Sequence, residues 1–219
     1  MRKWMALLLS VMLLCCCTAS FAEETAEDLY RKAAEVYQAG NIEQAAAYFQ
    51  QAADLGHMNA QFNIAYMYSI GRGVEQSYET ALAYYLMAAE QGDAEAMNRV
   101  GDLYEKGLGT EQSWEKALEY YLLSAEQENA ESLNRLGALY ETGGPVEQSY
   151  EKAAEYYRQA AELGFAIGQF NLGRMYILGT GVEQSYETAA EWIRRARDSG
   201  YEGAADALNY MIAQGWITE

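Results

Sequence analysis

The chain has 219 residues, with 32 acidic and 15 basic side chains and a net charge of −17. This excess of carboxylates makes nucleic acids and anionic membrane surfaces poor partners, because both repel an acidic protein. All three cysteines lie within residues 1–17, so the remaining chain has to fold without disulfides.

Residues 1–22 have the composition of a cleavable export signal. Arg2 and Lys3 precede an apolar run over residues 6–17, and the small residues Ser20 and Ala22 occupy the two positions that a signal peptidase reads. The run has about a dozen residues, fewer than the ~20 needed to cross a bilayer. We expect cleavage after Ala22 and a periplasmic or secreted protein with no membrane span.

A lipoprotein signal is the alternative interpretation of this segment. Cys15, Cys16 and Cys17 close the apolar run, but none of them follows the small residue of a lipobox. Cleavage after Ala22 would leave 13 basic and 32 acidic residues, a net charge of −19.

Residues 23–59 are predicted to form an N-terminal helical unit. The segment Tyr37-x-x-Gly40-Asn41-Ile42-x-x-Ala45 resembles a plain tetratricopeptide unit with a short loop. Apolar residues of its second half are in register with those of the units that follow.

Four units of 36 residues then follow without insertion, at residues 60–95, 96–131, 132–167 and 168–203. The triplet Glu-Gln-Ser recurs once in each, at 75–77, 111–113, 147–149 and 183–185. A fixed period of this size indicates a repeat array. Apolar residues fall at helical spacing in two stretches of each unit, which predicts two helices per unit.

Glycine and serine mark the expected ends of these helices. In the first full unit, Gly71 can take the positive φ that ends the first helix, and Ser77 suits the N-cap of the second. Glycine also ends the second helix in most units, but Glu128 replaces it in the second, where we expect Asn129 to be left-handed. Thr110 and Pro145 replace loop residues of the other units and are expected to change the packing of their loops.

At these positions the chain resembles the Sel-one-like repeat family, the longer-looped relative of tetratricopeptide repeats. The family pattern small-x-x-x-Leu-Gly-x-x-Tyr-x-x-Gly-x-Gly-Val, followed by Lys-Ala and Ala-Ala-x-x-Gly, is matched from Ala60 to Gly92 and in the three later units. The resemblance implies an all-α, right-handed α/α solenoid. Residues 204–219 repeat the first-helix pattern and are expected to form a C-terminal capping helix.

Two Ser-x-x-Lys matches, at 113–116 and 149–152, are the strongest catalytic candidates in the sequence. The Ser-Asp-Asn and Lys-Thr-Gly partners of that motif are absent, and the same serine caps a predicted helix in every full unit. His57 is the single histidine, so no His-His or His-Cys metal site can form. We therefore expect a non-enzyme without metal or cofactor.

The candidate binding residues lie where the units differ, since packing does not dictate those positions. By analogy with tetratricopeptide geometry, the first helices line a concave face, and positions five and nine of each unit are expected to face a ligand. The candidates are Tyr30, Phe62, Tyr66, Asn98, Asp102, Asn134, Phe170 and Arg174. Amides can bond to the backbone of an extended peptide while aromatic rings accept its apolar side chains.

The sequence thus favours an exported, monomeric, non-catalytic scaffold that binds a protein or peptide of unknown identity. The alternatives are a hydrolase of β-lactams or cell wall, an activity discussed for cysteine-rich secreted members of the family, and a binder of cell-wall fragments.

Overall fold

The computed structural model describes residues 24–218, and the predicted signal at 1–22 lies outside them. Within this range the chain is all-α, as predicted, and contains eleven helices. They are α2 (Ala26–Gln38), α3 (Ile42–Asp54), α4 (Met58–Ile70), α5 (Tyr78–Glu90), α6 (Ala94–Lys106), α7 (Trp114–Ala125), α8 (Ala130–Thr142), α9 (Tyr150–Glu162), α10 (Ala166–Leu178), α11 (Tyr186–Asp198) and α12 (Gly203–Ala213).

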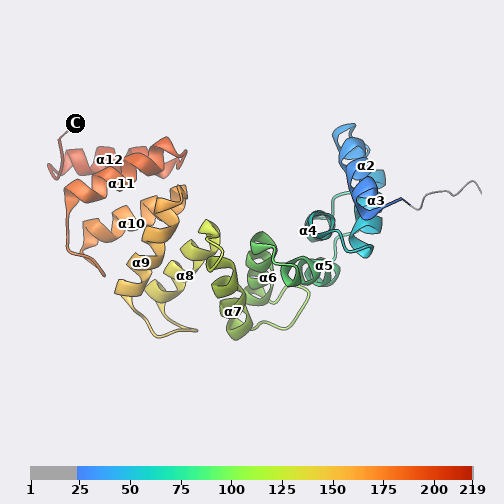
Figure 1. Cartoon of the computed structure of the whole chain (residues 1–219). Coiled ribbons are helices and arrows are strands. Elements are labelled where there is room, and N and C mark those ends of the chain that lie inside the picture. Colours follow the sequence, from blue (N-terminus) through green and yellow to red (C-terminus); the bar gives the residue numbers. More distant parts are fainter. Residues whose placement is uncertain (1–23, 219) are drawn as a thin grey trace, which may run out of the picture.

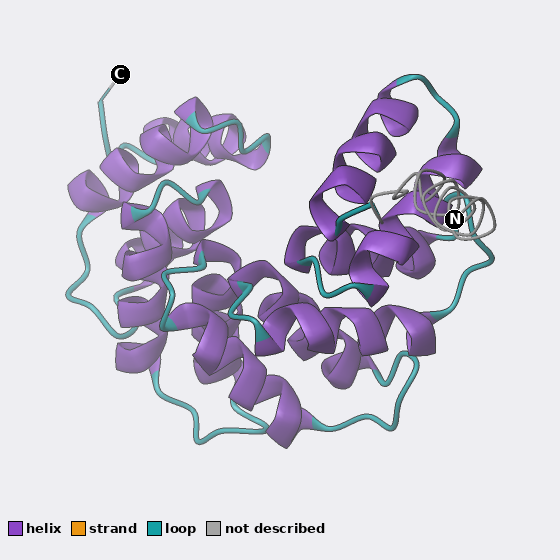
Figure 2. Cartoon of the chain, turned by 45° about the vertical axis from the view of Figure 1, so that its right-hand side comes forward, coloured by secondary structure: helices purple, strands orange, loops and turns teal. Residues whose placement is uncertain are grey.

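Successive helices pair into five hairpins, from α2/α3 to α10/α11, and α12 packs on α11 without a second helix of its own. Each first helix from α4 to α10 begins two residues before the predicted start of its unit. The hairpins stack in chain order into an open arc with α2 at one end and α12 at the other (Figure 1). Figure 1 also shows α4 and α6 on the inner side of the arc, and α5 and α7 on the outer side. In Figure 2 the two ends of the arc face each other across its open side.

The helix ends follow from the glycines and serines of each unit. The hydroxyl oxygens of Ser77, Ser113, Ser149 and Ser185 each accept a hydrogen bond from the backbone N–H three residues later, at 3.2 to 3.3 Å. These bonds satisfy a backbone donor that the first turn of a helix leaves unpaired, so the predicted N-caps are confirmed.

The glycine that ends each first helix is left-handed in three units, with φ of 68° at Gly71. Gly143 departs from this geometry, with φ 75° and ψ −160°. This is the unit in which Pro145 fixes the backbone of the following loop, so the expected difference in that loop is confirmed. Thr110 leaves the helix end of its unit unchanged, since Gly107 is left-handed with φ 64° and ψ 34°.

One predicted turn residue is wrong. Glu128, rather than Asn129, takes the left-handed conformation between α7 and α8, with φ 59°. Asn129 instead caps α8, because its side-chain oxygen accepts a hydrogen bond from the Ser132 N–H at 3.0 Å. A residue in the extended conformation of an N-cap cannot also be left-handed.

Within a hairpin, the small residue of the first helix lies against a large side chain of the second. A Cβ added to Gly101 would lie 2.6 Å from the ring of Tyr121, and one added to Gly137 would lie 2.6 Å from the ring of Tyr157. In the last full unit Gly173 stands in the same relation to Ile193. The missing Cβ is therefore what allows the two helices of these three hairpins to approach closely.

Candidate functional site

An inner row of side chains runs along the first helices of the hairpins on the concave side of the arc. It consists of Asn63, Tyr66 and Ile70 on α4, Arg99, Asp102 and Lys106 on α6, Arg135, Ala138 and Thr142 on α8, and Asn171, Arg174 and Leu178 on α10. These residues recur at the same positions of successive units, one helical turn apart. Their chemistry changes from unit to unit, from uncharged on α4 to charged on α6 and mixed on α10.

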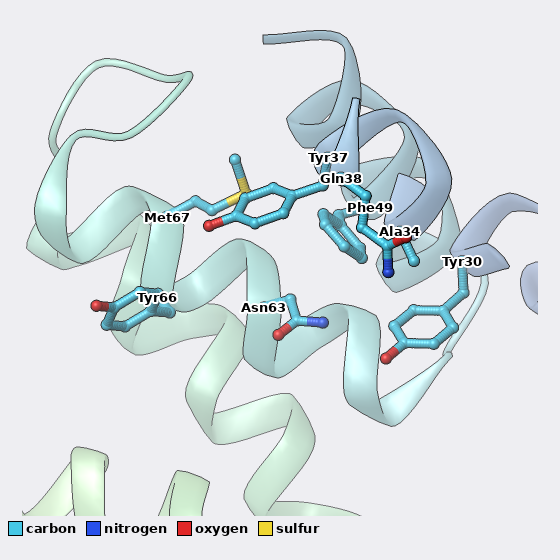
Figure 3. A pocket seen from close by; sticks show the side chains of 8 residues that line it. All are labelled: Tyr30, Ala34, Tyr37, Gln38, Phe49, Asn63, Tyr66 and Met67. Atoms are coloured by element: carbon cyan, nitrogen blue, oxygen red, sulfur yellow. The ribbon is translucent and has the colours of Figure 1, made fainter. Parts of the chain in front are cut away.

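The first pocket lies between α2 and α4 and has a volume of about 300 Å³. Tyr30 and Tyr66 flank it on opposite sides, with Asn63 between them and Tyr37 and Phe49 above (Figure 3). Its other lining residues are Ala34, Gln38 and Met67, so no charged side chain lines it. An apolar pocket of this volume with a few amide groups is typical of a binding site.

Two tyrosines that line the first pocket also contact residues outside it. The Tyr30 ring stacks on the His57 ring, with centroids 4.3 Å apart, and the Arg72 guanidinium lies 4.9 Å from the centroid of Tyr37. His57 is itself held by two contacts: its Nδ1 accepts from the Ala60 N–H at 3.2 Å, and its Nε2 lies 3.0 Å from a carboxylate oxygen of Glu27. The single histidine is thus the N-cap of α4.

The second pocket, of about 340 Å³, adjoins the first and lies between α4 and α6. Tyr66 lines both pockets and is 46% exposed, so one tyrosine separates them. Ile70 and Leu103 are among its apolar lining residues, and Tyr85 closes the wall toward α5. Burial raises the pKa of Tyr85 to about 12, so the group remains a neutral hydroxyl.

Charged groups of the second pocket belong to a network along α6 and α8. Arg99 lies 2.6 Å from Glu95, 3.2 Å from Glu131 and 3.6 Å from Asp102. Burial alone would lower the pKa of Arg99, but the three carboxylates outweigh it and raise the pKa. The positive charge of Arg99 is therefore already balanced within the chain.

A second ion pair lies further along the concave face, between α8 and α10. One guanidinium nitrogen of Arg174 lies 2.7 and 2.6 Å from the two carboxylate oxygens of Glu141, and the Tyr157 hydroxyl donates to the same carboxylate at 2.9 Å. Burial of Glu141 raises its pKa, but these hydrogen bonds and the charge of Arg174 outweigh burial and hold the pKa below its usual range.

The predicted binding residues at position nine lie on the inner row. Tyr66 lines both pockets, Asp102 lines the second, and Arg174 is engaged by Glu141. Tyr30, on α2, lines the first pocket together with Tyr66. The structure therefore brings together Tyr30 with Tyr66 and Tyr66 with Asp102.

Apart from Tyr30, the predicted residues at position five have a different role, because their side chains turn toward neighbouring helices. Asn98 is fully buried and accepts a hydrogen bond from the Ser132 hydroxyl at 2.8 Å, so the expectation that it faces a ligand is wrong. Asn134 accepts from the Asn171 amide at 3.0 Å. Phe62 packs on Tyr85 with centroids 5.4 Å apart.

Phe170 completes this set, with its ring centroid 4.5 Å from that of Tyr201. Position five thus mainly joins one helix to its neighbours. Position five lies one helical turn before position nine, but its side chain turns toward the unit that packs beside it.

Several pocket residues were missed by the sequence reasoning. Phe49 is in register with Tyr85 on the second helices, where aromatic residues were interpreted as packing residues, and Tyr37 lies beyond positions five and nine, the only positions considered. Asn63 and Arg99 could have been found, because their position varies between units as Asn63, Arg99, Arg135 and Asn171.

In both Ser-x-x-Lys matches the serine caps a helix and the lysine contacts an aromatic ring. Ser113 accepts from the backbone N–H of Lys116, whose ammonium lies 4.9 Å from the ring centroid of Tyr104. Ser149 and Lys152 repeat the arrangement, with the ammonium 5.0 Å from the centroid of Tyr140. Capping and a cation–π contact thus account for both residue types.

Among residues 24–218 no helix has both the length and the apolar character that crossing a membrane requires. The same part of the chain contains no group of three or more His, Cys, Asp and Glu side chains suited to a metal ion.

Comparison with solved structures shows which proteins share this arrangement. A protective antigen of uropathogenic Escherichia coli with an SLR fold is 31% identical, with a TM-score of 0.80, and the match covers 87% of this chain and 42% of that one. A Sel1 repeat protein from Oxalobacter formigenes is 34% identical, with a TM-score of 0.71, over 77% of this chain and 49% of that one. This chain thus spans less than half of the length of either.

An immunity protein from Pseudomonas aeruginosa shares the fold at 23% identity, with a TM-score of 0.55, over 82% of this chain and 68% of that one. No curated protein sequence matches the chain. The model of the Sel1 repeat matches residues 36–57, 59–93, 94–129, 130–165 and 166–201, which together make up most of the sequence. The chain therefore belongs to the Sel1 repeat family.

Proposed function

We propose that this protein is a non-catalytic scaffold that binds an extended segment of another protein along its concave face. The observation that carries the proposal is the pair of adjoining pockets on either side of Tyr66. An extended segment places alternate side chains, which point to the same face, in the two pockets, with Tyr66 between them, while Asn63 bonds to its backbone.

The charge distribution on the inner row supports this location. The first pocket has no charged lining residue in a chain of net charge −17, and Arg99 is balanced by its own carboxylates. Apolar contact is therefore expected to contribute most of the affinity in the first pocket, with tyrosines as the main anchors.

A photo-crosslinking residue placed at Tyr66 tests the groove. It should capture a partner in cells that express the protein, whereas the same residue at Met87, 38% exposed on α5 and outside both pockets, should not. With the purified partner, Tyr66→Ala should weaken binding about 30-fold, the loss typical of an anchoring tyrosine, and Met87→Ala should leave it unchanged. Equal effects at the two positions would contradict the groove.

We further propose that residues 1–22 direct export to the periplasm or the medium. The support is the basic start, the apolar run and the small residues before position 23 in the sequence. The mass of the mature N-terminus tests this proposal: a chain that begins at Glu23 supports it, and a diacylglyceryl cysteine replaces it with a lipoprotein anchor.

A further inference from the structure

Three positions recur at fixed spacing where one unit packs on the next, and we call each set of three a junction. Each junction has one residue in the last turn of a first helix, one on the second helix of the same unit and one on the first helix of the next unit. In chain order, the four junctions are Ser69/Tyr85/Asp102, Glu105/Tyr121/Ala138, Glu141/Tyr157/Arg174 and Ile177/Ile193/Tyr210. Within a junction, the second residue follows the first by 16 positions and the third follows the first by 33, as Tyr157 and Arg174 follow Glu141.

The third junction is a complete guanidinium site made by the chain itself. Glu141 receives the Arg174 guanidinium at 2.7 and 2.6 Å and the Tyr157 hydroxyl at 2.9 Å. The Glu141 side chain is only 19% exposed, so both donors act in a partly desolvated setting. Charge-assisted hydrogen bonds of this kind are the strong ones.

The second junction has the same glutamate and tyrosine but no arginine. Ala138 occupies the position that Arg174 occupies one unit later, and it is partly exposed on the inner row. The Tyr121 hydroxyl lies 2.6 Å from a Glu105 oxygen and 2.7 Å from an Asp102 oxygen. A phenol has one proton to donate, so it can satisfy only one of these two carboxylates.

The cations of the chain do not complete this junction. Of the two carboxylates that contact Tyr121, Arg99 and Arg135 approach Asp102, at 3.6 and 3.5 Å, whereas within residues 24–218 no lysine or arginine forms an ion pair with Glu105. Burial, the hydrogen bond to Glu105 and the charge of Asp102 all raise the pKa of Tyr121, which keeps the phenol neutral. Two carboxylates therefore share one phenolic proton beside an alanine.

We propose that the second junction binds the guanidinium group of an arginine supplied by the protein segment in the concave groove. The geometry of the third junction shows that a glutamate and a tyrosine at these two positions hold a guanidinium. Asp102 links the site to the second pocket, which it also lines. The net charge of −17 attracts a basic segment, and the planar fork of arginine suits a carboxylate better than the compact ammonium of lysine does.

This proposal rests on the proposed function, because it takes the arginine to be part of a groove-bound segment. A small probe tests the site without the partner. N-acetyl-arginine amide is titrated into protein labelled with ¹³C at the tyrosine rings, and Tyr121→Phe assigns the resonance. The Tyr121 ring signal should shift and saturate with the arginine probe. The neutral citrulline analogue should leave it unmoved.

Three variants sharpen the experiment. Glu105→Gln keeps the shape and should weaken binding of the probe about tenfold or more, as expected when hydrogen bonds to a charged group are lost. Ala138→Arg should fill the site from within and abolish the response. Arg174→Ala should open the third junction, so that the Tyr157 ring also responds.

A response at Tyr157 in Arg174→Ala without one at Tyr121 in the natural sequence would overturn the proposal, because it would show that only the third junction binds a guanidinium. No response at either ring, or an equal response to citrulline, would overturn it too. Capture at Tyr66 would be unaffected by these results, so the groove and the arginine site can fail separately.

Discussion

At the scale of single residues, Glu141 illustrates how a concave-face carboxylate contributes to stability. Its pKa is lowered in the folded chain because hydrogen bonds from Arg174 and Tyr157 outweigh the effect of burial. A carboxyl group of this kind stabilises the fold at pH values above its unfolded pKa of ~4.3, and the contribution is lost as the pH falls through the folded pKa.

We therefore expect Glu141→Gln to lower the free energy of unfolding by about 1 kcal/mol at neutral pH, since the pair is only partly shielded from water. The difference from the natural sequence should shrink below about pH 4.3 and vanish once both forms are neutral. Urea unfolding followed by circular dichroism at several pH values measures it. Glu119→Gln, on the exposed face of α7, is the control. A difference that does not change with pH would contradict this account.

The sequence could place Tyr66 and Asp102 on the concave face because helical spacing fixes which side of a helix a residue occupies. It could not place Asn98, because burial there depends on Ser132 of the next unit, 34 residues away. Tyr37 was also missed, because it lies one helical turn beyond position nine of its unit and only positions five and nine were expected to face a ligand.

At the scale of the helices, capping serines and terminal glycines predicted most boundaries because each satisfies a defined backbone requirement. The exception is the turn after α7, where the position in the unit outweighs residue preference. Glu128 adopts a positive φ of 59°, although asparagine, the next residue, tolerates that conformation better. The corresponding residues Gly56, Gly92, Gly164 and Gly200 have φ values of 85° to 96°.

Glu128→Gly should raise the free energy of unfolding by up to about 1 kcal/mol, because glycine relieves the left-handed strain of a side chain with a Cβ. Gln127→Gly is the matched control one residue earlier, where φ is not positive, and it should not raise the free energy of unfolding. Thermal melting of the two variants compares them. Equal melting temperatures would show that the turn carries no strain.

At the scale of the whole molecule, the fold could be predicted because a 36-residue period recurs in four units and each of them has two stretches with helical spacing of apolar residues. The pockets could not be predicted in the same way, because each combines residues of two units and of at least two helices.

The excess of acidic residues should also affect stability as a whole. Carboxylates along the arc repel one another, and salt screens that repulsion. Raising NaCl from about 0.02 M to about 0.5 M should therefore raise the melting temperature by about 3–5 °C. Calorimetry measures the change, and KCl should give the same result if screening is the cause. A melting temperature that falls with salt would indicate that ion pairs such as Arg99–Glu131 outweigh repulsion.

The loops between paired helices have a consequence for how such a chain can change in length. Gly109, in the loop after α6, approaches the backbone of Tyr78 at the start of α5, and Gly181 approaches Tyr150 in the same way two units later. Each of these loops thus fits against the second helix of the unit before it. Duplication or loss of 36 residues in the gene leaves matching faces in contact, so the arc can lengthen or shorten by whole units without inventing a new interface.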